Sequence, residues 1–98
     1  MKGRRVFRVE DIIEPGDYFG PTGDFTNGIP AVHFLKPNAH DPAAPKRAHE
    51  KQYVISPPHT FTEEPDGSLT VRASIGDEAG NSESDGWHGY LTKGEWHL

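Results

Sequence analysis

Short apolar runs alternate with clusters of turn residues along most of the chain. Runs of this length that are rich in Val, Ile, Phe and Tyr are typical of β-strands. The pattern predicts strands over residues 4–9, 17–19, 31–35 and 53–55. Eleven glycines and nine prolines interrupt every candidate helix. We therefore expect helical structure only as short turns, over residues 10–14 and 46–51.

The segment 59–73 has the clearest hairpin signal in the chain. Pro65 suits the first central position of a type I turn, and Gly67 suits the left-handed residue that follows it. This turn predicts four cross-strand pairs: Glu63 with Leu69, Thr62 with Thr70, Phe61 with Val71, and Thr60 with Arg72. A slip of one residue would exchange the two faces of the hairpin. In the predicted register Phe61 and Val71 share the core face.

The last segment, residues 87–98, contains both tryptophans and predicts a second hairpin. If it turns at residues 92–94 in the same way, Gly94 takes the left-handed position. The predicted pairs are then Tyr90 with Trp96, Gly89 with His97, and His88 with Leu98. We expect Trp87, Tyr90 and Trp96 to pack as an aromatic group that closes the sheet, with ligand stacking as the alternative role.

The connections are polar and rich in Gly and Pro, and we expect exposed loops over residues 20–30, 36–51 and 76–86. Phe25 is expected to anchor the first of these loops to the core. The sequence as a whole predicts one mainly β domain over residues 1–98. This domain is expected to be a small antiparallel sheet or curled sandwich with long loops.

The composition adds information on the core and on possible partners. Only 19 of the 98 residues are Leu, Ile, Val or Phe, so the core is thin and depends on its ten aromatic residues. Oligomerisation or docking on a partner would help to stabilise such a chain. The net charge of −5 disfavours nucleic-acid binding, and the basic residues Lys2, Arg4, Arg5 and Arg8 fit a solvated first strand. A membrane-spanning apolar run and a secretory leader are both missing, so we expect a soluble, intracellular protein.

Candidate chemistry is sparse. The chain has no cysteine, which excludes disulfides, thiolate ligands and cysteine nucleophiles. Ser56, Ser68 and Ser74 lie outside any Gly-x-Ser-x-Gly motif, and the acidic pairs fall in turns. The six histidines lack a metal-binding spacing, so a metal site would need ligands from separated strands and loops. We therefore expect a protein without catalytic residues or cofactor.

Four sequence blocks resemble a small uncharacterised family that is common in bacteria and their phages and is often mislabelled ammonia monooxygenase. The resembling blocks are Ile13-Glu-Pro-Gly16, Phe34-Leu-Lys-Pro-Asn-Ala-His40, Gly67-Ser-Leu-Thr-Val-Arg-Ala-Ser-Ile75 and Asp85-Gly-Trp-His-Gly-Tyr-Leu-Thr-Lys-Gly94. The third and fourth blocks are the more specific ones. The resemblance covers about residues 11–98.

The family's Cys-Pro-Cys-Gly-Cys motif implies a zinc site. Here the corresponding positions and the family's later cysteine are occupied by Lys36, Asn38, His40 and Asp85, which implies that the scaffold persists without the metal. The minority alternative that the resemblance implies is a remnant metal site built from His40, Asp85 and either His33 or His88. The resemblance favours a non-enzymatic phage or prophage accessory protein that acts by protein contact, such as a capsid-associated virion component. Its partner would be a second copy, a capsid protein or a host protein, and its location the virion or the host cytoplasm. The alternatives are a zinc-binding module and an inhibitor of a host factor.

Overall fold

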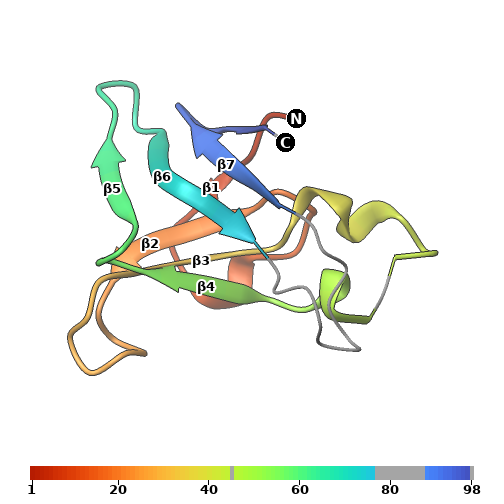
Figure 1. Cartoon of the computed structure of the whole chain (residues 1–98), viewed down its shortest axis with the longest axis horizontal. Helices are drawn as coiled ribbons and strands as arrows, with labels where there is room; N and C mark the ends of the chain where they lie inside the picture. The colour runs from red at the N-terminus through yellow and green to blue at the C-terminus, as the bar shows by residue number, and fades with distance from the viewer. Residues whose placement is uncertain (45, 77–87, 98) are drawn as a thin grey trace.

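The computed structural model describes residues 1–44, 46–76 and 88–97. It is a mainly β domain in which two four-stranded sheets form a curled half-barrel (Figure 1). The first sheet has the order β1-β2-β3-β4, and the second has the order β5-β6-β7-β8. The strands are β1 (Arg5–Val6), β2 (Tyr18–Thr22), β3 (Ala31–Phe34), β4 (Gln52–Ile55), β5 (Thr60–Glu63), β6 (Leu69–Gly76), β7 (His88–Thr92) and β8 (Glu95–His97).

Helical structure in the described parts of the chain consists of three short 3-10 turns, as the density of Gly and Pro predicts. They are η1 (Val9–Asp11), η2 (Pro37–His40) and η3 (Lys46–His49). The predicted turn over 10–14 is therefore shorter and begins one residue earlier. The predicted turn over 46–51 ends at His49.

The first sheet differs from the prediction at its edge. The expected strand over 4–9 is reduced to the two residues of β1, which pair in parallel with β2. After β1 the chain bends into η1, where the Arg8 guanidinium binds the Asp11 carboxylate, with Nε and Oδ2 3.1 Å apart. The strands β2, β3 and β4 pair antiparallel as expected. All four residues of β3 are buried, which confirms the buried strand predicted from the apolar run.

The hairpin of β5 and β6 has the predicted register. Thr60, Phe61, Thr62 and Glu63 lie opposite Arg72, Val71, Thr70 and Leu69. The turn between them forms as its sequence predicts, with Gly67 at a φ of +86° and the Ser68 carbonyl accepting a hydrogen bond from the Glu64 N–H. Phe61 packs against the core beside Val71. Local turn chemistry was sufficient here to determine which face is buried.

The predicted register of the final hairpin is wrong by one residue. The observed pairs are Tyr90 with His97, Leu91 with Trp96, and Thr92 with Glu95, while Gly89 and His88 lie opposite Ile75 and Gly76 of β6. The turn contains two residues rather than three, because Lys93 and Gly94 both adopt positive φ values, 49° and 78°. This geometry is that of a type I′ turn, which joins antiparallel strands without a bulge.

The corrected register changes which aromatic residues reach the core. Trp96 is buried beside Leu91, whereas Tyr90 is exposed and stacks on His97, with ring centroids 5.4 Å apart. The expected core pairing of Tyr90 with Trp96 is therefore wrong. The third aromatic residue of the expected group, Trp87, lies outside the described residues.

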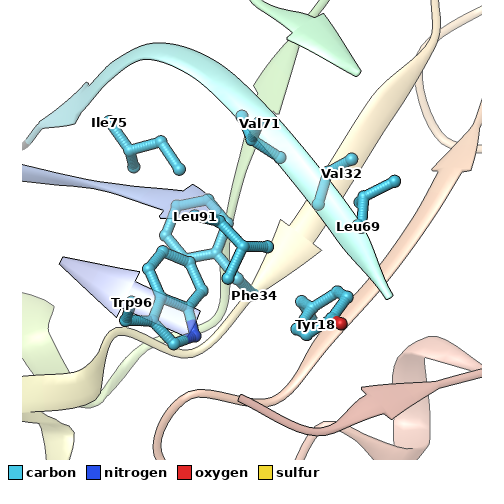
Figure 2. Close-up of a cluster of buried hydrophobic side chains, with 8 residues drawn as sticks. All are labelled: Tyr18, Val32, Phe34, Leu69, Val71, Ile75, Leu91 and Trp96. Carbon is cyan, nitrogen blue, oxygen red and sulfur yellow. The ribbon is translucent and has the colours of Figure 1, made fainter. Parts of the chain in front are cut away.

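The main core lies between the two sheets. Figure 2 shows eight buried side chains that converge from both sheets: Tyr18, Val32, Phe34, Leu69, Val71, Ile75, Leu91 and Trp96. The largest contribution from the second sheet is the Trp96 ring, which packs against Phe34 of the first sheet with centroids 5.5 Å apart. Aromatic rings thus supply much of the volume that a chain with few aliphatic residues lacks.

The two chain ends meet beside this core (Figure 1). The Trp96 indole N–H donates a hydrogen bond of 2.8 Å to the Gly16 carbonyl, and the Trp96 backbone N–H donates to the Met1 carbonyl. Gly3 lies against this contact. A Cβ atom at Gly3 would stand 2.7 Å from the Gly16 carbonyl oxygen and 2.8 Å from the indole nitrogen, so the position has no room for a side chain.

Two loop predictions are also wrong in part. Phe25 does not reach the core: its side chain is 58% exposed and contacts His33 on the outer face of the first sheet. The segment 36–51 is not uniformly exposed, because Lys36 and Ala48 are both buried. The loop expected over 76–86 falls almost entirely outside the described residues, and its first residue, Gly76, ends β6.

The variant Trp96→Phe tests the junction of the two sheets. It removes the indole donor and leaves the buried Gly16 carbonyl without its partner, in addition to creating a cavity. We expect a loss of about 2–4 kcal/mol in the free energy of unfolding, measured by urea denaturation. Tyr90→Phe on the opposite face is the control and should change stability by less than about 0.5 kcal/mol. Equal stability of the two variants would contradict this role of Trp96.

The two turn glycines allow a matched comparison. Both have positive φ, but a Cβ atom at Gly94 would lie 3.1 Å from Ser68 Cβ and from Tyr18 Oη, whereas nothing lies within 4 Å of one at Gly67. We expect Gly67→Ala to cost about 1 kcal/mol from backbone strain alone and Gly94→Ala about 2 kcal/mol or more. Thermal and urea unfolding of both variants measure the difference. A larger cost at Gly67 would contradict the close packing of Ser68 and Tyr18 on Gly94.

Candidate interaction surface

Exposed apolar side chains are concentrated on the first sheet and its connections. Seven large hydrophobic residues of the described chain are exposed, and five of them belong to this half of the molecule: Phe7, Ile13, Phe25, Ile29 and Tyr53. The other two are Met1 and Tyr90. Such a concentration on one part of a small protein is characteristic of an interaction site, whereas single scattered residues carry no such meaning.

The outer face of the first sheet is formed by one row of residues that crosses all four strands. Val6, Phe19, His33 and Tyr53 lie opposite one another in successive strands. Residues directly opposite in neighbouring strands share a face. Val32 and Phe34 of β3 point into the main core, so His33 between them points outward.

One end of this row is covered and the other is open. Val6 packs with Ile12 and Leu35 in a second small core, which also contacts Val9 of η1 and Ala39 of η2. At the β4 end the row continues into His33 and Tyr53, and Phe25 approaches from the loop between β2 and β3. The apolar outer face is therefore only partly covered by the protein's own chain.

We refer to Phe25, His33 and Tyr53 as the aromatic surface. The His33 ring contacts the Phe25 ring edge-on at a centroid distance of 5.1 Å and the Tyr53 ring at 5.5 Å, and the ring of Phe19, the neighbour of His33 in the same row, lies 6.0 Å away. His33 itself is only 7% exposed, while Phe25 and Tyr53 are 58% and 57% exposed. A buried imidazole thus supports two solvent-facing rings.

The environment of His33 is unusual for a histidine. Its Nε2 atom is buried and has no hydrogen-bond partner in the described chain. Burial lowers the pKa of His33 below its ordinary value of 6.5, because the charged imidazolium loses its hydration there. The ring is therefore neutral at pH 7. It packs as an apolar group with one unused polar atom.

A shallow pocket of about 510 Å³ lies beside β1 and η1, where two of the exposed apolar residues lie among charged side chains. The lining residues are Arg4, Arg5, Val6, Phe7, Arg8, Asp11 and Ile13. The three guanidinium groups are held by neighbours: Arg4 by Asp17, Arg5 by Glu63 and Arg8 by Asp11. The pocket therefore presents Phe7 and Ile13 beside charges that are already paired within the chain.

The position of the segment carrying Ile13 is fixed by Asp17. This buried carboxylate accepts two hydrogen bonds from Arg4, and its Oδ2 accepts further bonds from the backbone N–H groups of Ile13 and Glu14 at 3.1 and 2.8 Å. Burial alone would raise the pKa of Asp17, but these hydrogen bonds outweigh it and hold the pKa below its ordinary 3.8. A charged Asp17 thus orders the edge of the pocket.

The residues that the sequence predicted as structural or interaction residues, apart from Trp87, which is not among the described residues, lie on the second sheet and its turns and do not form one site. Phe61, Val71 and Trp96 belong to the main core, while Pro65, Gly67 and Gly94 form turns. His88 is exposed, and its ring lies directly over Gly76, where a Cβ atom would come within 2.4 Å of it. Tyr90 is on the outer face, stacked on His97.

The minority metal hypothesis finds no support in the described part of the chain. Among residues 1–44, 46–76 and 88–97, no three His, Asp or Glu side chains are placed so that they could hold a metal ion. His33 lies within the aromatic surface, and the Nδ1 atom of His40 is hydrogen-bonded to the Pro37 carbonyl at 2.7 Å. Asp85, the carboxylate of that hypothesis, lies outside the described residues.

The aromatic surface was not predicted from the sequence. Its three members come from a loop and two strands that are not joined by a short turn, and only the pairing of β3 with β4 brings His33 opposite Tyr53. The one available signal was a histidine inside a buried apolar strand, flanked by Val32 and Phe34. That pattern indicates that His33 points away from the main core.

No family model, no curated protein and no solved structure matches this chain. The resemblance in the four sequence blocks therefore stays a prediction. Among the described residues, no helix has the length and apolar character needed to cross a membrane.

The ionised state of Asp17 predicts an acid-dependent loss of stability. Because its folded pKa is depressed, its contribution is complete above the ordinary value of 3.8 and is lost as the pH falls through the folded value. We expect Asp17→Asn to lose about 2 kcal/mol at pH 7 and to show a weaker pH dependence below about pH 4. Urea unfolding across this range provides the measurement.

Asp24→Asn is the control for this prediction, because Asp24 is exposed. It should follow the wild-type pH profile. An Asp17→Asn variant with the wild-type slope in acid would show that Asp17 does not carry the effect.

Proposed function

We propose that this chain is a non-enzymatic protein that acts by protein contact and that it binds through the outer face of its first sheet. The observation that carries the proposal is the placement of five of the seven exposed large hydrophobic residues on that sheet and its connections. Interfaces bury a core of aromatic and aliphatic side chains inside a polar rim. The aromatic surface provides the apolar centre of the interface, and the paired arginines beside Phe7 and Ile13 provide its polar rim.

The size of the protein supports contact as its mode of action. A chain with a thin core gains stability when a partner covers its exposed apolar face. Phe25 and Tyr53 are the best candidates for the centre of the interface. Their rings are large and rigid and already pack on His33, so little side-chain conformational freedom would be lost on binding.

The narrower proposal, a phage accessory protein associated with the capsid, rests on the sequence resemblance. The contact surface is compatible with three kinds of partner: a capsid protein, a host factor or a second copy of the chain. The first two kinds of partner differ in whether this protein is found in purified virus particles. A virion component is present in purified particles in a fixed ratio to the capsid protein, whereas a host-factor inhibitor is absent from them.

The double variant Phe25→Ser/Tyr53→Ser tests the contact surface. We expect it to fold, because both side chains are more than half exposed, and to lose at least tenfold in binding. The readout is the amount of the protein in purified particles from the native source, by quantitative mass spectrometry, and its self-association in sedimentation experiments.

Tyr90→Ser on the second sheet is the matched control and should bind as the wild type does. Loss of binding in Tyr90→Ser together with retention in the double variant would contradict the proposed surface. Absence of the wild-type protein from the particles would remove the virion version and leave a host factor or a second copy as the partner.

A further inference from the structure

We propose that proton uptake by His33 releases the loop of residues 23–29 from the first sheet and so makes the aromatic surface sensitive to pH. The inference adds regulation to the contact surface of the proposed function. It concerns the chain alone, however, and can be tested without a partner.

The loop is built as a separate unit. Three backbone hydrogen bonds close within it: Thr26 and Gly28 donate to the Gly23 carbonyl at 3.3 and 3.0 Å, and Ile29 donates to the Thr26 carbonyl at 3.1 Å. A fourth, from the Asp24 N–H to the Thr22 hydroxyl at 3.2 Å, lies at the hinge where the loop leaves β2. The Thr26 hydroxyl also bonds to the Ile29 carbonyl. A Cβ atom at Gly23 would stand 2.8 Å from Gly28 Cα, so the two ends of the loop pack directly on each other. Such a unit can move without breaking its own bonds.

Phe25 provides the ring contact between this loop and the sheet. Its ring meets the edge of His33 at 5.1 Å and is otherwise largely exposed. The neighbouring anchor is the Pro30 carbonyl, which accepts a hydrogen bond from the Ser56 N–H at 2.9 Å just after the loop. The loop can therefore swing away from His33 while its end at Pro30 stays fixed.

Protonation of His33 disfavours the closed arrangement. The imidazolium would carry a buried Nε2–H without an acceptor, and a buried charge without a partner is costly. The titratable groups on the elements packed around His33 are Tyr18 on β2, whose side chain points into the main core, Tyr53 on β4 and Asp24 on the loop, with Lys51 just before β4. The ion pairs of the described chain leave His33 without a carboxylate partner.

Movement of the loop is the least disruptive way to hydrate the charged ring. Phe19 and Tyr53 belong to strands whose backbones are paired on β3, whereas Phe25 is on a loop with few bonds to the sheet. The lowered pKa of His33 agrees with a closed form that excludes the proton. By linkage, the closed form is fully favoured above the ordinary pKa of 6.5 and loses this advantage as the pH falls.

Solution NMR of the chain alone tests this inference between about pH 7.5 and pH 5, the range in which histidine titrates. We expect His33 to titrate below its ordinary 6.5 and the cross-peaks between the Phe25 and His33 rings to weaken at least severalfold with the same midpoint. Cross-peaks between Thr26 and Gly23 inside the loop should persist. Persistence of the Phe25 to His33 cross-peaks while His33 titrates would overturn the proposal.

Two variants distinguish the effect of protonating His33 from that of protonating another histidine. His33→Phe keeps an aromatic ring that cannot take up a proton, so the contact with Phe25 should be the same at both ends of the pH range. His40→Gln removes an exposed histidine and should keep the wild-type response. A loop that opens equally in His33→Phe would refute the role of His33. If His33→Phe does not fold, the wild-type protein still tests the proposal. The pH midpoint at which the Phe25 to His33 cross-peaks weaken must then equal the midpoint of the His33 titration. These measurements use the chain alone, so their outcome does not depend on whether the proposed contact surface binds a partner.

Discussion

The arrangement of the two sheets depends on the contact between the Trp96 indole and the Gly16 carbonyl. The ring packs against Phe34 of the first sheet, and its N–H spans 2.8 Å to the segment that precedes β2. Gly3 and Gly16 leave the space that the indole needs, since a Cβ atom at Gly3 would stand 2.8 Å from its nitrogen. Because the Trp96 backbone N–H also bonds to the Met1 carbonyl, this one residue connects β8 to the first residues of the chain as well as to the segment before β2.

This junction also determines what the protein presents to solvent. With Val32 and Phe34 directed into the core against Trp96 and Leu91, the residue between them must point outward. His33 therefore lies on the outer face, where it supports the rings of Phe25 and Tyr53. The exposed rings and the well-packed interior are two results of the same alternation along β3. The proposed contact surface and its response to protons both follow from that position.

Features that depend on neighbouring residues could be predicted from the sequence, and features that depend on distant ones could not. Pro65 and Gly67 determined the turn and hence every pair of β5 with β6. The same reasoning failed at the last hairpin because Lys93, a residue with a Cβ atom, adopts positive φ and shortens the turn. The aromatic surface requires pairing between β3 and β4, whose connection holds two 3-10 turns, so no local signal specified it.

Hydrogen exchange of the Trp96 indole N–H tests most directly whether this junction holds the sheets together. The account predicts that this proton exchanges only through global unfolding, with the same free energy of opening as the slowest amides of β6 and β7, although Trp96 lies in the last described strand. Exchange of the indole proton through a local opening of much lower free energy, while β6 and β7 stay protected, would contradict it.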